Sequence, residues 1–450
     1  MRITEDFLLD SPLARTLYFE HCAGLPIIDM HNHLCVGDLV ADKPVSDLAS
    51  LWVAGDPYKH RAMRINGVPE DLITGDASPK EKFEAWAKTY PYTIGNPLYH
   101  FSSLELKRVF GIDAPLSEDT ADDIWDRCNA IIAERQMKSR DLLALFNVEA
   151  LYPCADLLAD IDCSDLAQQL VPSLRGDSIL AFDPAWCIRL CGGDLPAGLT
   201  EFLDAVDARL SVLASRGYMI ADHAIDNGER YVGKVDAARV FADIMCGKNV
   251  SAQELSGLKS YVLLHLLRKY SSMGWTLLLH VGAERHTSSR LRALAGPAGG
   301  YAAIGNSADI RSLCSLLDAA DCDGALPKTV LFNLNPSDNA AFATLTGSFS
   351  QDGVWGKLQF GPAWWYNDHL SGIEAQLEAV SSYGLLGRFI GMTTDSRSLL
   401  SLSRHEYFRR LLCSYVARKA AAGLFDSDEA VLGKLVEDIS YYNVKNWLKQ

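Results

Sequence analysis

Two histidines separated by one residue follow a short apolar run near the start of the chain. Residues 25–30 have the composition of a β-strand, and His31 and His33 come directly after them. Alternate residues of a strand point the same way, so we expect both imidazoles to project together from the strand's end. This arrangement presents two nitrogen ligands to one divalent cation, most commonly zinc. The alternative is a pair of polar side chains in a solvent-facing loop.

The overall composition is that of an ordinary globular protein. The chain has 450 residues, of which 48% are hydrophobic and 22% charged, so it can bury a large core. Its 42 basic and 57 acidic residues give a net charge of −15, and no Lys/Arg-rich block is present. We therefore expect no nucleic-acid partner. An acidic protein that binds an anion must place its arginines locally, so arginines near the two histidines are of interest.

Targeting and cysteine signals indicate a cytoplasmic protein. The first ten residues contain no apolar segment of the secretory type, and no apolar run approaches the roughly 18 residues that a membrane span requires. The 11 cysteines are scattered and include no Cys-x-x-Cys pair. This favours reduced, buried thiols over a thiol nucleophile or a zinc–thiolate site. We expect no association with a membrane.

Short apolar runs alternate with longer stretches of helical periodicity along the chain. The eight predicted strands are residues 25–30, 148–153, 179–184, 218–222, 276–280, 329–333, 358–362 and 389–393. Between two of them, Ser251 and Glu254 form a capping-box pattern that opens a helix. Eight strand–helix units predict an α/β fold, a (β/α)8 TIM barrel, whose active site lies at the carboxyl ends of the strands.

The segment between the first two predicted strands is too long for one helix. The pattern of residues 37–147 predicts several helices, with turns at positions 55–57 and 95–97. We predict a helical insertion after strand 1, lying over the barrel mouth, with residues 1–36 and 148–450 forming the barrel. Such insertions commonly supply substrate contacts.

Other predicted strand ends carry ionisable residues. Asp395 follows the eighth predicted strand, and with His31 and His33 it makes a set of two nitrogens and a carboxylate, an open catalytic set for zinc. His280 ends the fifth strand and is either a further ligand, a partner of a ligand, or a structural histidine. His223 follows the fourth strand, where a structural role is slightly favoured over an orienting one.

Segments spread over nearly the whole chain resemble the uronate isomerases of the amidohydrolase superfamily. They are residues 55–64, 74–78, 95–100, 104–108, 326–328, 334–336, 363–368, 391–398 and 404–410. They occur in the family's order. The resemblance implies aldose–ketose interconversion of hexuronates in sugar-acid catabolism, from D-glucuronate to D-fructuronate and from D-galacturonate to D-tagaturonate.

The resemblance also implies roles for individual residues. It implies one divalent cation, zinc before others, held by His31, His33 and Asp395. The implied catalytic residues are Asp395, Tyr58 and Arg397, and the implied substrate-binding residues are Arg175, Arg397, Tyr58, His280 and Trp364. The chemistry suits these groups, because isomerisation moves hydrogen between C2 and C1 while the two oxygens exchange carbonyl and hydroxyl roles. A cation can polarise both oxygens, and a carboxylate or phenol can transfer protons.

The remote carboxylate of a uronate needs a planar, permanently charged partner. Arg397, beside Asp395, fits this need, although an ion pair that braces the barrel is the alternative. Arg175 lies in a Leu-Arg-Gly-Asp segment that matches the family's Phe-Arg-Pro-Asp. Trp364 and Trp365 either form an apolar wall against the sugar or pack beneath loops. The expected partners are a small hexuronate and, at most, further copies of the chain in a homo-oligomer.

The chain departs from the family pattern at three places. The family's Gly-Asp-His-Tyr-Lys-Trp-Arg has Pro57 here in place of the first His and His60 in place of Trp. Proline cannot titrate, so any proton transfer by that imidazole is absent, and His60 is not interchangeable with it. Residues 153–157 replace Thr-Thr-Asp-Asp-Pro, and residues 298–303 replace Asp-Thr-Gly-Phe-Asp-Ser. The sequence therefore indicates a divergent member, with another metal-dependent enzyme of the superfamily (an altered sugar-acid isomerase or a hydrolase) and a non-catalytic sugar-acid-binding relative as alternatives.

Overall fold

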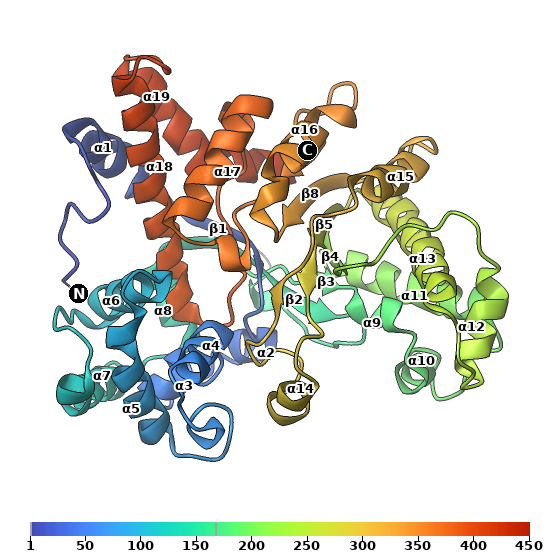
Figure 1. Cartoon of the computed structure of the whole chain (residues 1–450), viewed down its shortest axis with the longest axis horizontal. Helices are drawn as coiled ribbons and strands as arrows, with labels where there is room; N and C mark the ends of the chain where they lie inside the picture. The colour runs from blue at the N-terminus through green and yellow to red at the C-terminus, as the bar shows by residue number, and fades with distance from the viewer. Residues whose placement is uncertain (1, 167–168) are drawn as a thin grey trace.

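A parallel β-sheet forms the centre of the molecule (Figure 1). A computed structural model describes residues 2–166 and 169–450. Within these residues the sheet has seven strands in the order β1-β2-β3-β4-β5-β8-β9. They are β1 (Ile27–Asn32), β2 (Val148–Asp156), β3 (Ser173–Arg175), β4 (Ile220–Ile225), β5 (Thr276–Val281), β8 (Lys328–Asn333) and β9 (Leu358–Phe360). The short strands β6 (Ala283–Glu284) and β7 (Ala303–Ile304) pair separately. The predicted α/β class with parallel strands is confirmed.

The sequences of the central strands explain why they lie inside. All six residues of β5, Thr-Leu-Leu-Leu-His-Val, are buried, as expected for a parallel strand that is covered on both faces. All six residues of β1 are also buried, although they include Asp29. A buried carboxylate needs hydrogen-bond partners. Asp29 Oδ1 accepts from the backbone N–H of Thr394 at 2.8 Å and lies 2.7 Å from the Thr393 hydroxyl.

The prediction of an eighth strand at residues 389–393 is wrong, since these residues are not part of a β-ladder. The segment nevertheless runs beside β1. The His31 N–H donates to the Thr393 hydroxyl at 2.9 Å, and the Asp395 N–H donates to the His31 carbonyl at 3.1 Å. Gly391 and Asp395 have φ angles of 80° and 47°, which interrupt an extended backbone. We call residues 389–396 the seam segment.

The prediction of a third strand at residues 179–184 is also wrong. Helix α9 (Asp177–Ala181) occupies the first half of that range, and the third strand is β3, just before the helix. β3 pairs with both β2 and β4 and ends at Arg175. A three-residue strand is too short to show a period of two in the sequence, whereas the apolar run at 179–182 suits either a strand or a helical turn.

Helices fill the long gap between β1 and β2 and follow most later strands. The gap contains α2 (Val36–Val40), α3 (Leu48–Trp52), α4 (Pro57–Ile65), α5 (Pro79–Thr89), α6 (Pro97–Phe110), α7 (Ala121–Glu134) and α8 (Ser139–Leu145). The other helices are α1 (Pro12–Thr16), α9, α10 (Pro184–Leu190), α11 (Leu199–Ser215), α12 (Ala237–Met245), α13 (Ala252–Ser272), α14 (Ser289–Ala295), α15 (Ile310–Asp321), α16 (Asn339–Ser348), α17 (Leu370–Tyr383), α18 (Arg404–Ala421), α19 (Glu429–Glu437) and α20 (Asn443–Leu448). In Figure 1 helices α3–α7 gather at one side of the sheet and α10–α13 at the other.

Local signals set the helix boundaries. The predicted capping box at the start of α13 is present, with the Ser251 hydroxyl accepting from the Glu254 N–H and the Glu254 carboxylate accepting from the Ser251 N–H. Within residues 2–166 and 169–450, no helix is long and apolar enough to span a membrane.

Candidate active site

A cavity of about 730 Å³ is lined by residues from the carboxyl ends of several strands. This volume is in the range of small-molecule sites. The lining includes all the predicted site residues, namely His31, His33, Tyr58, Arg175, His280, Trp364, Asp395 and Arg397. His223 is not among them. It is fully buried and forms a 2.8 Å hydrogen bond through Nε2 with the Tyr270 hydroxyl, which agrees with the favoured structural role.

His31, His33 and Asp395 converge at one wall of this cavity. His31 Nε2 is 3.1 Å and His33 Nε2 is 3.0 Å from Asp395 Oδ1. β1 ends at Asn32, so His31 lies in the strand and His33 directly after it. The seam segment brings in Asp395, whose left-handed backbone is uncommon for a residue other than glycine and is often found at functional sites.

The charges around these three side chains favour a cation. Burial alone would lower the pKa of His31, but Cys154, Asp222 and Asp395 together raise that pKa well above its usual value. The pKa of His33 is also raised, against the effect of burial, by Cys154 and Asp395. Burial would raise the pKa of Asp395, yet the two histidines hold it well below its usual range. The surroundings therefore stabilise positive charge at this point, and the donor set of two imidazoles and a carboxylate fits a divalent cation.

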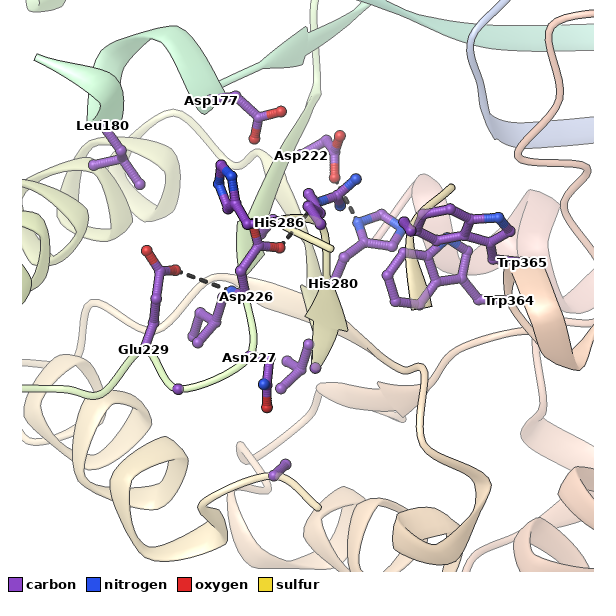
Figure 2. Close-up of a pocket in the computed structure, with 18 of the residues that line it drawn as sticks. Asp177, Leu180, Asp222, Asp226, Asn227, Glu229, His280, His286, Trp364 and Trp365 are labelled. Atoms are coloured by element: carbon purple, nitrogen blue, oxygen red, sulfur yellow. Dashed lines mark hydrogen bonds and ion pairs between the residues drawn. The ribbon is translucent and has the colours of Figure 1, made fainter. Parts of the chain in front are cut away.

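A second group of polar side chains lies behind His31. Cys154 Sγ is 3.5 Å from His31 Nδ1 and 3.7 Å from Asp222 Oδ2. Asp222 Oδ1 is 2.6 Å from His280 Nδ1. Figure 2 shows His280 between Asp222 and Trp364. The sequence reasoning placed Asp222 at a strand end without a role and treated Cys154 as an ordinary buried thiol, because neither has a motif of its own.

Among the residues that the structure describes, two sets of three side chains have potential ligand atoms within 4.8 Å of one another. They are His31, His33 and Cys154, and His31, Asp222 and His280. Both sets contain His31, whose Nδ1 lies 3.5 Å from Cys154 Sγ and whose Nε2 lies 3.1 Å from Asp395 Oδ1.

The two arginines predicted to bind a carboxylate share one region of the cavity. Arg175 Nε donates to Asp177 at 2.9 Å, and its Nη1 is 3.1 Å from His33 Nδ1. Arg397 is exposed and forms no ion pair with any residue that the structure describes. Although Arg397 is open to the cavity, the protein atoms around its guanidinium partly desolvate it, and this effect together with the nearby charge of Arg175 lowers the pKa of Arg397. Two guanidinium groups that repel each other are stabilised by an anion between them.

Tyr58 and Trp364 contribute an aromatic wall with polar tips. The Arg404 guanidinium lies 4.8 Å from the centre of the Tyr58 ring. The Tyr58 hydroxyl is buried and has no hydrogen-bond partner among the described residues, and burial raises its pKa well above the usual value. The phenol is therefore a protonated donor. Trp364 Nε1 donates to Asp395 Oδ2 at 2.7 Å, which fixes the second oxygen of that carboxylate.

The departures at positions 57 and 60 have structural explanations. Pro57 is the first residue of α4, where proline is favoured, and Asp56 caps the helix by accepting from the N–H groups of Tyr58 and Lys59. The ring of His60 bonds to the Val53 carbonyl at 3.0 Å and does not line the cavity. His60 therefore does not replace the imidazole that the family pattern has at position 57.

Comparison with known proteins decides the family. Residues 1–448 match the family described as glucuronate isomerase. The chain belongs to the glucuronate isomerase family. It is 38% identical over 462 residues to a uronate isomerase of Caldanaerobacter subterraneus, covering 99% of this chain and 98% of that protein. It is 40% identical over 461 residues to a uronate isomerase of Bacillus licheniformis, covering 99% and 97%. The predicted resemblance is confirmed.

Solved structures of uronate isomerases share the fold over the whole length. The uronate isomerase of Thermotoga maritima superposes with a TM-score of 0.91 at 30% identity, covering 100% of both chains. The glucuronate isomerase of Caulobacter crescentus has a TM-score of 0.90 at 23% identity, covering 99% of this chain and 97% of that one, and shows likeness of fold. This member of the glucuronate isomerase family thus keeps the family's architecture despite its changes at residues 57, 153–157 and 298–303.

Proposed function

We propose that the protein is a metal-dependent uronate isomerase that interconverts D-glucuronate with D-fructuronate and D-galacturonate with D-tagaturonate. The observation that carries this proposal is the arrangement of one cavity. Nε2 of His31, Nε2 of His33 and Oδ1 of Asp395 meet at one of its walls, and the same cavity contains two arginines suited to a carboxylate. An aldehyde end and a carboxylate end of one small sugar acid match these two features.

His31, His33 and Asp395 would hold one divalent cation, with zinc expected first. Bound there, it would polarise the oxygens on C1 and C2 of the sugar. This set is preferred over the two sets that involve Cys154 or Asp222, because Nε2 of both histidines already faces a single carboxylate oxygen. The Nδ1 atom of His31 faces the thiol instead.

The other cavity residues bind and orient the substrate. Arg175 and Arg397 would bind its carboxylate, as the charge-assisted partners of an anion. The unpartnered Tyr58 hydroxyl would donate a proton or hydrogen bond to a sugar oxygen, and Trp364 would contact the apolar face of the carbon chain. The Asp395 carboxylate lies within reach of the same oxygens and would accept a proton during the transfer between C2 and C1.

The finer architecture belongs to the same proposal. The seam segment would complete the sheet as the eighth element of a (β/α)8 barrel, because it hydrogen-bonds along β1. Residues 37–147 would form the insertion over the barrel mouth, and residues 1–36 and 148–450 the barrel. We also propose a cytoplasmic location and assembly with further copies of the chain, both on the grounds of the sequence alone.

The proposal is tested by incubating the purified, zinc-supplemented protein with each hexuronate and following the ketose signals by ¹H NMR. We expect conversion of at least one of the two sugars, at about one cation per chain by elemental analysis. Full metal occupancy without conversion of either sugar would refute the isomerase and favour another metal-dependent reaction of the superfamily. A protein without metal or turnover that still binds hexuronates would be a sugar-acid-binding relative.

A further inference from the structure

A continuous line of polar groups connects two histidines of the cavity through Asp222. One carboxylate oxygen, Oδ1, is 2.6 Å from His280 Nδ1. The other, Oδ2, accepts from the Cys154 thiol at 3.7 Å, and the same sulfur is 3.5 Å from His31 Nδ1. The side chains of His31, Asp222 and His280 are 1%, 8% and 4% exposed, so water does not compete for these contacts.

The hydrogens on this line can be assigned for the protonated Cys154 thiol once a cation occupies Nε2 of His31, a condition that rests on the proposed function. A neutral imidazole carries its hydrogen on the other nitrogen, so His31 Nδ1–H donates to the Cys154 sulfur. The thiol hydrogen then goes to Asp222 Oδ2. Because an ionised carboxylate can only accept, a neutral His280 whose Nδ1 lies 2.6 Å from Asp222 Oδ1 carries its hydrogen on that nitrogen. His280 Nε2 is left with a free lone pair.

That lone pair faces the cavity. His280 Nε2 is buried and has no hydrogen-bond partner within the part of the chain that the structure describes, and His280 lines the cavity. The ring is held between Phe332, stacked with the ring centres 4.4 Å apart, and Trp364 at 4.6 Å. A buried acceptor without a partner is costly unless a ligand supplies a donor. A hydroxyl of a polyhydroxy acid is such a donor.

We propose that Asp222 is a positioning residue that sets the tautomers of two histidines, that of His280 directly and that of His31 through the Cys154 thiol. His31 thereby presents Nε2 to the cation, and His280 presents Nε2 to a substrate hydroxyl. Partners behind a metal-ligating histidine commonly fix its orientation and raise its basicity. Cys154 lies in the 153–157 segment, where the family pattern has Thr-Thr-Asp-Asp-Pro, so a thiol here occupies the position of a hydroxyl that can donate and accept in the same way.

The test uses ¹⁵N NMR of histidine-labelled full-length protein together with zinc titration by competition with a chelator. In wild type we expect His280 to carry its hydrogen on Nδ1, and its signal to be assigned by its loss in His280→Asn. In Asp222→Asn the amide can donate to Nδ1, so the hydrogen should move to Nε2. Zinc affinity should fall by roughly 10- to 100-fold, the usual effect of losing a partner of a metal ligand.

Two cysteine variants separate the direct effect of Asp222 on His280 from its effect on His31 through the Cys154 thiol. Cys154→Ala should lower zinc affinity while the His280 tautomer stays as in wild type. Cys154→Ser should restore the affinity, because a hydroxyl both accepts and donates. Asp207→Asn is the matched control, since Asp207 accepts from His265 Nε2 at 2.9 Å outside the site and should change neither readout.

The proposal is overturned if folded Asp222→Asn keeps the wild-type His280 tautomer, or if its zinc affinity stays within threefold of wild type. It is also overturned if wild type binds two zinc ions and Asp222→Asn binds one, because His31, Asp222 and His280 would then be ligands of a second cation. None of these readouts needs a hexuronate. Intact tautomer control without turnover would therefore refute the proposed function and leave the positioning role standing.

Discussion

Asp395 has separate partners for its two carboxylate oxygens. Oδ1 faces Nε2 of His31 and of His33, and Oδ2 accepts from the Trp364 indole. The tryptophan thus keeps one oxygen engaged and leaves the other directed at the imidazoles. This explains how an aspartate in a polar segment, Thr-Thr-Asp-Ser-Arg, becomes part of a defined donor set.

Replacing His33 with Ala should remove the cation without unfolding the protein. His33 lies just beyond the end of β1 with 16% of its side chain exposed, so little packing is lost, whereas one of three proposed ligands disappears. Elemental analysis should give less than a tenth of the wild-type zinc, and isomerisation should be lost with it, while circular dichroism stays unchanged. His265→Ala is the control and should keep its zinc. A His33→Ala protein with wild-type metal content and rate would contradict the assignment.

Replacing Arg397 with Lys keeps the charge but removes the planar, two-pronged donor. We expect a lower kcat/KM for the preferred hexuronate. The loss of transition-state stabilisation should be about 1.5–3 kcal/mol, the scale of a charge-assisted hydrogen bond. A neutral hexose should be a poor substrate of both forms. Arg268→Lys, which alters an exposed pair with Asp323, serves as the control. Unchanged hexuronate kinetics would move Arg397 to a structural role.

At the level of single residues, the sequence was sufficient to nominate the groups that share the cavity. His31 and His33 were identifiable from spacing, and Tyr58 and Arg175 from the family resemblance. The contacts of Cys154 and Asp222 were not predictable, because they depend on how β2, β4 and β5 register beside β1. Neighbouring parallel strands bring such residues together across long stretches of sequence.

Among the elements, helix α4 and the loop at residues 298–302 contain two of the departures from the family pattern, and the two segments lie against each other. Gly300 has a φ of 83°, and a Cβ added to it would lie 2.2 Å from the Pro57 carbonyl oxygen. Arg61 from the same helix donates to the Ala302 carbonyl at 3.0 Å. The changes at Pro57 and at 298–303 are therefore in contact, and each provides part of the other's surroundings.

This contact predicts a specific cost for Gly300→Ala. The new methyl group would collide with the backbone of α4 in addition to straining a left-handed conformation, so we expect a loss of about 1–3 kcal/mol in the free energy of unfolding. Gly247→Ala is the matched control, with a φ of 71° but nothing within 4 Å of the added Cβ. Urea denaturation should show the larger loss for Gly300→Ala. Equal losses would mean that the loop moves away from α4 freely.

The start of α4 also predicts an order of effects on turnover. Tyr58→Phe removes a buried donor from the cavity, and help from one positioned proton donor is typically worth ~10²–10⁴ in rate. Pro57→His should change the rate less, because the surrounding residues 298–303 no longer match the family pattern. Steady-state kinetics on both hexuronates compare the two variants. A large gain from Pro57→His alone would show that the missing imidazole limits the enzyme.

The strand positions illustrate where sequence patterns suffice for an element and where they fail. β5 and β8 were predicted to within one residue at each end because long apolar runs covered on both faces are distinctive. β3 has only three residues, and its neighbour α9 has the stronger apolar run, so the prediction fell on the wrong segment. Residues 389–393 of the seam segment were predicted as a strand because they are mostly apolar, but the positive φ angles of Gly391 and Asp395 cannot be seen in composition.

For the whole molecule, cation binding should be measurable as stability. A ligand that binds only the folded state stabilises it by RT ln(1 + [L]/Kd), about 2.7 kcal/mol at a free zinc concentration of 100 Kd. Chelation of the wild type should therefore lower the midpoint of thermal unfolding, and added zinc should restore it. His33→Ala should not respond to either treatment. An unchanged midpoint for chelated wild type would indicate that the cation, if bound, is not coupled to the fold.

The seam between the first strand and residues 389–396 has a consequence for the order of assembly. Its contacts join residues as far apart as 365 positions, as in the bond from the Thr394 N–H to the Asp29 carboxylate. Contacts so distant along the chain close a very large loop, and their entropic cost is met only when the intervening structure has formed. During synthesis the two histidines emerge long before the aspartate. The proposed metal site is therefore completed late, and a nascent or truncated chain ending before residue 395 would carry the H-x-H motif without the carboxylate proposed to complete the ligand set.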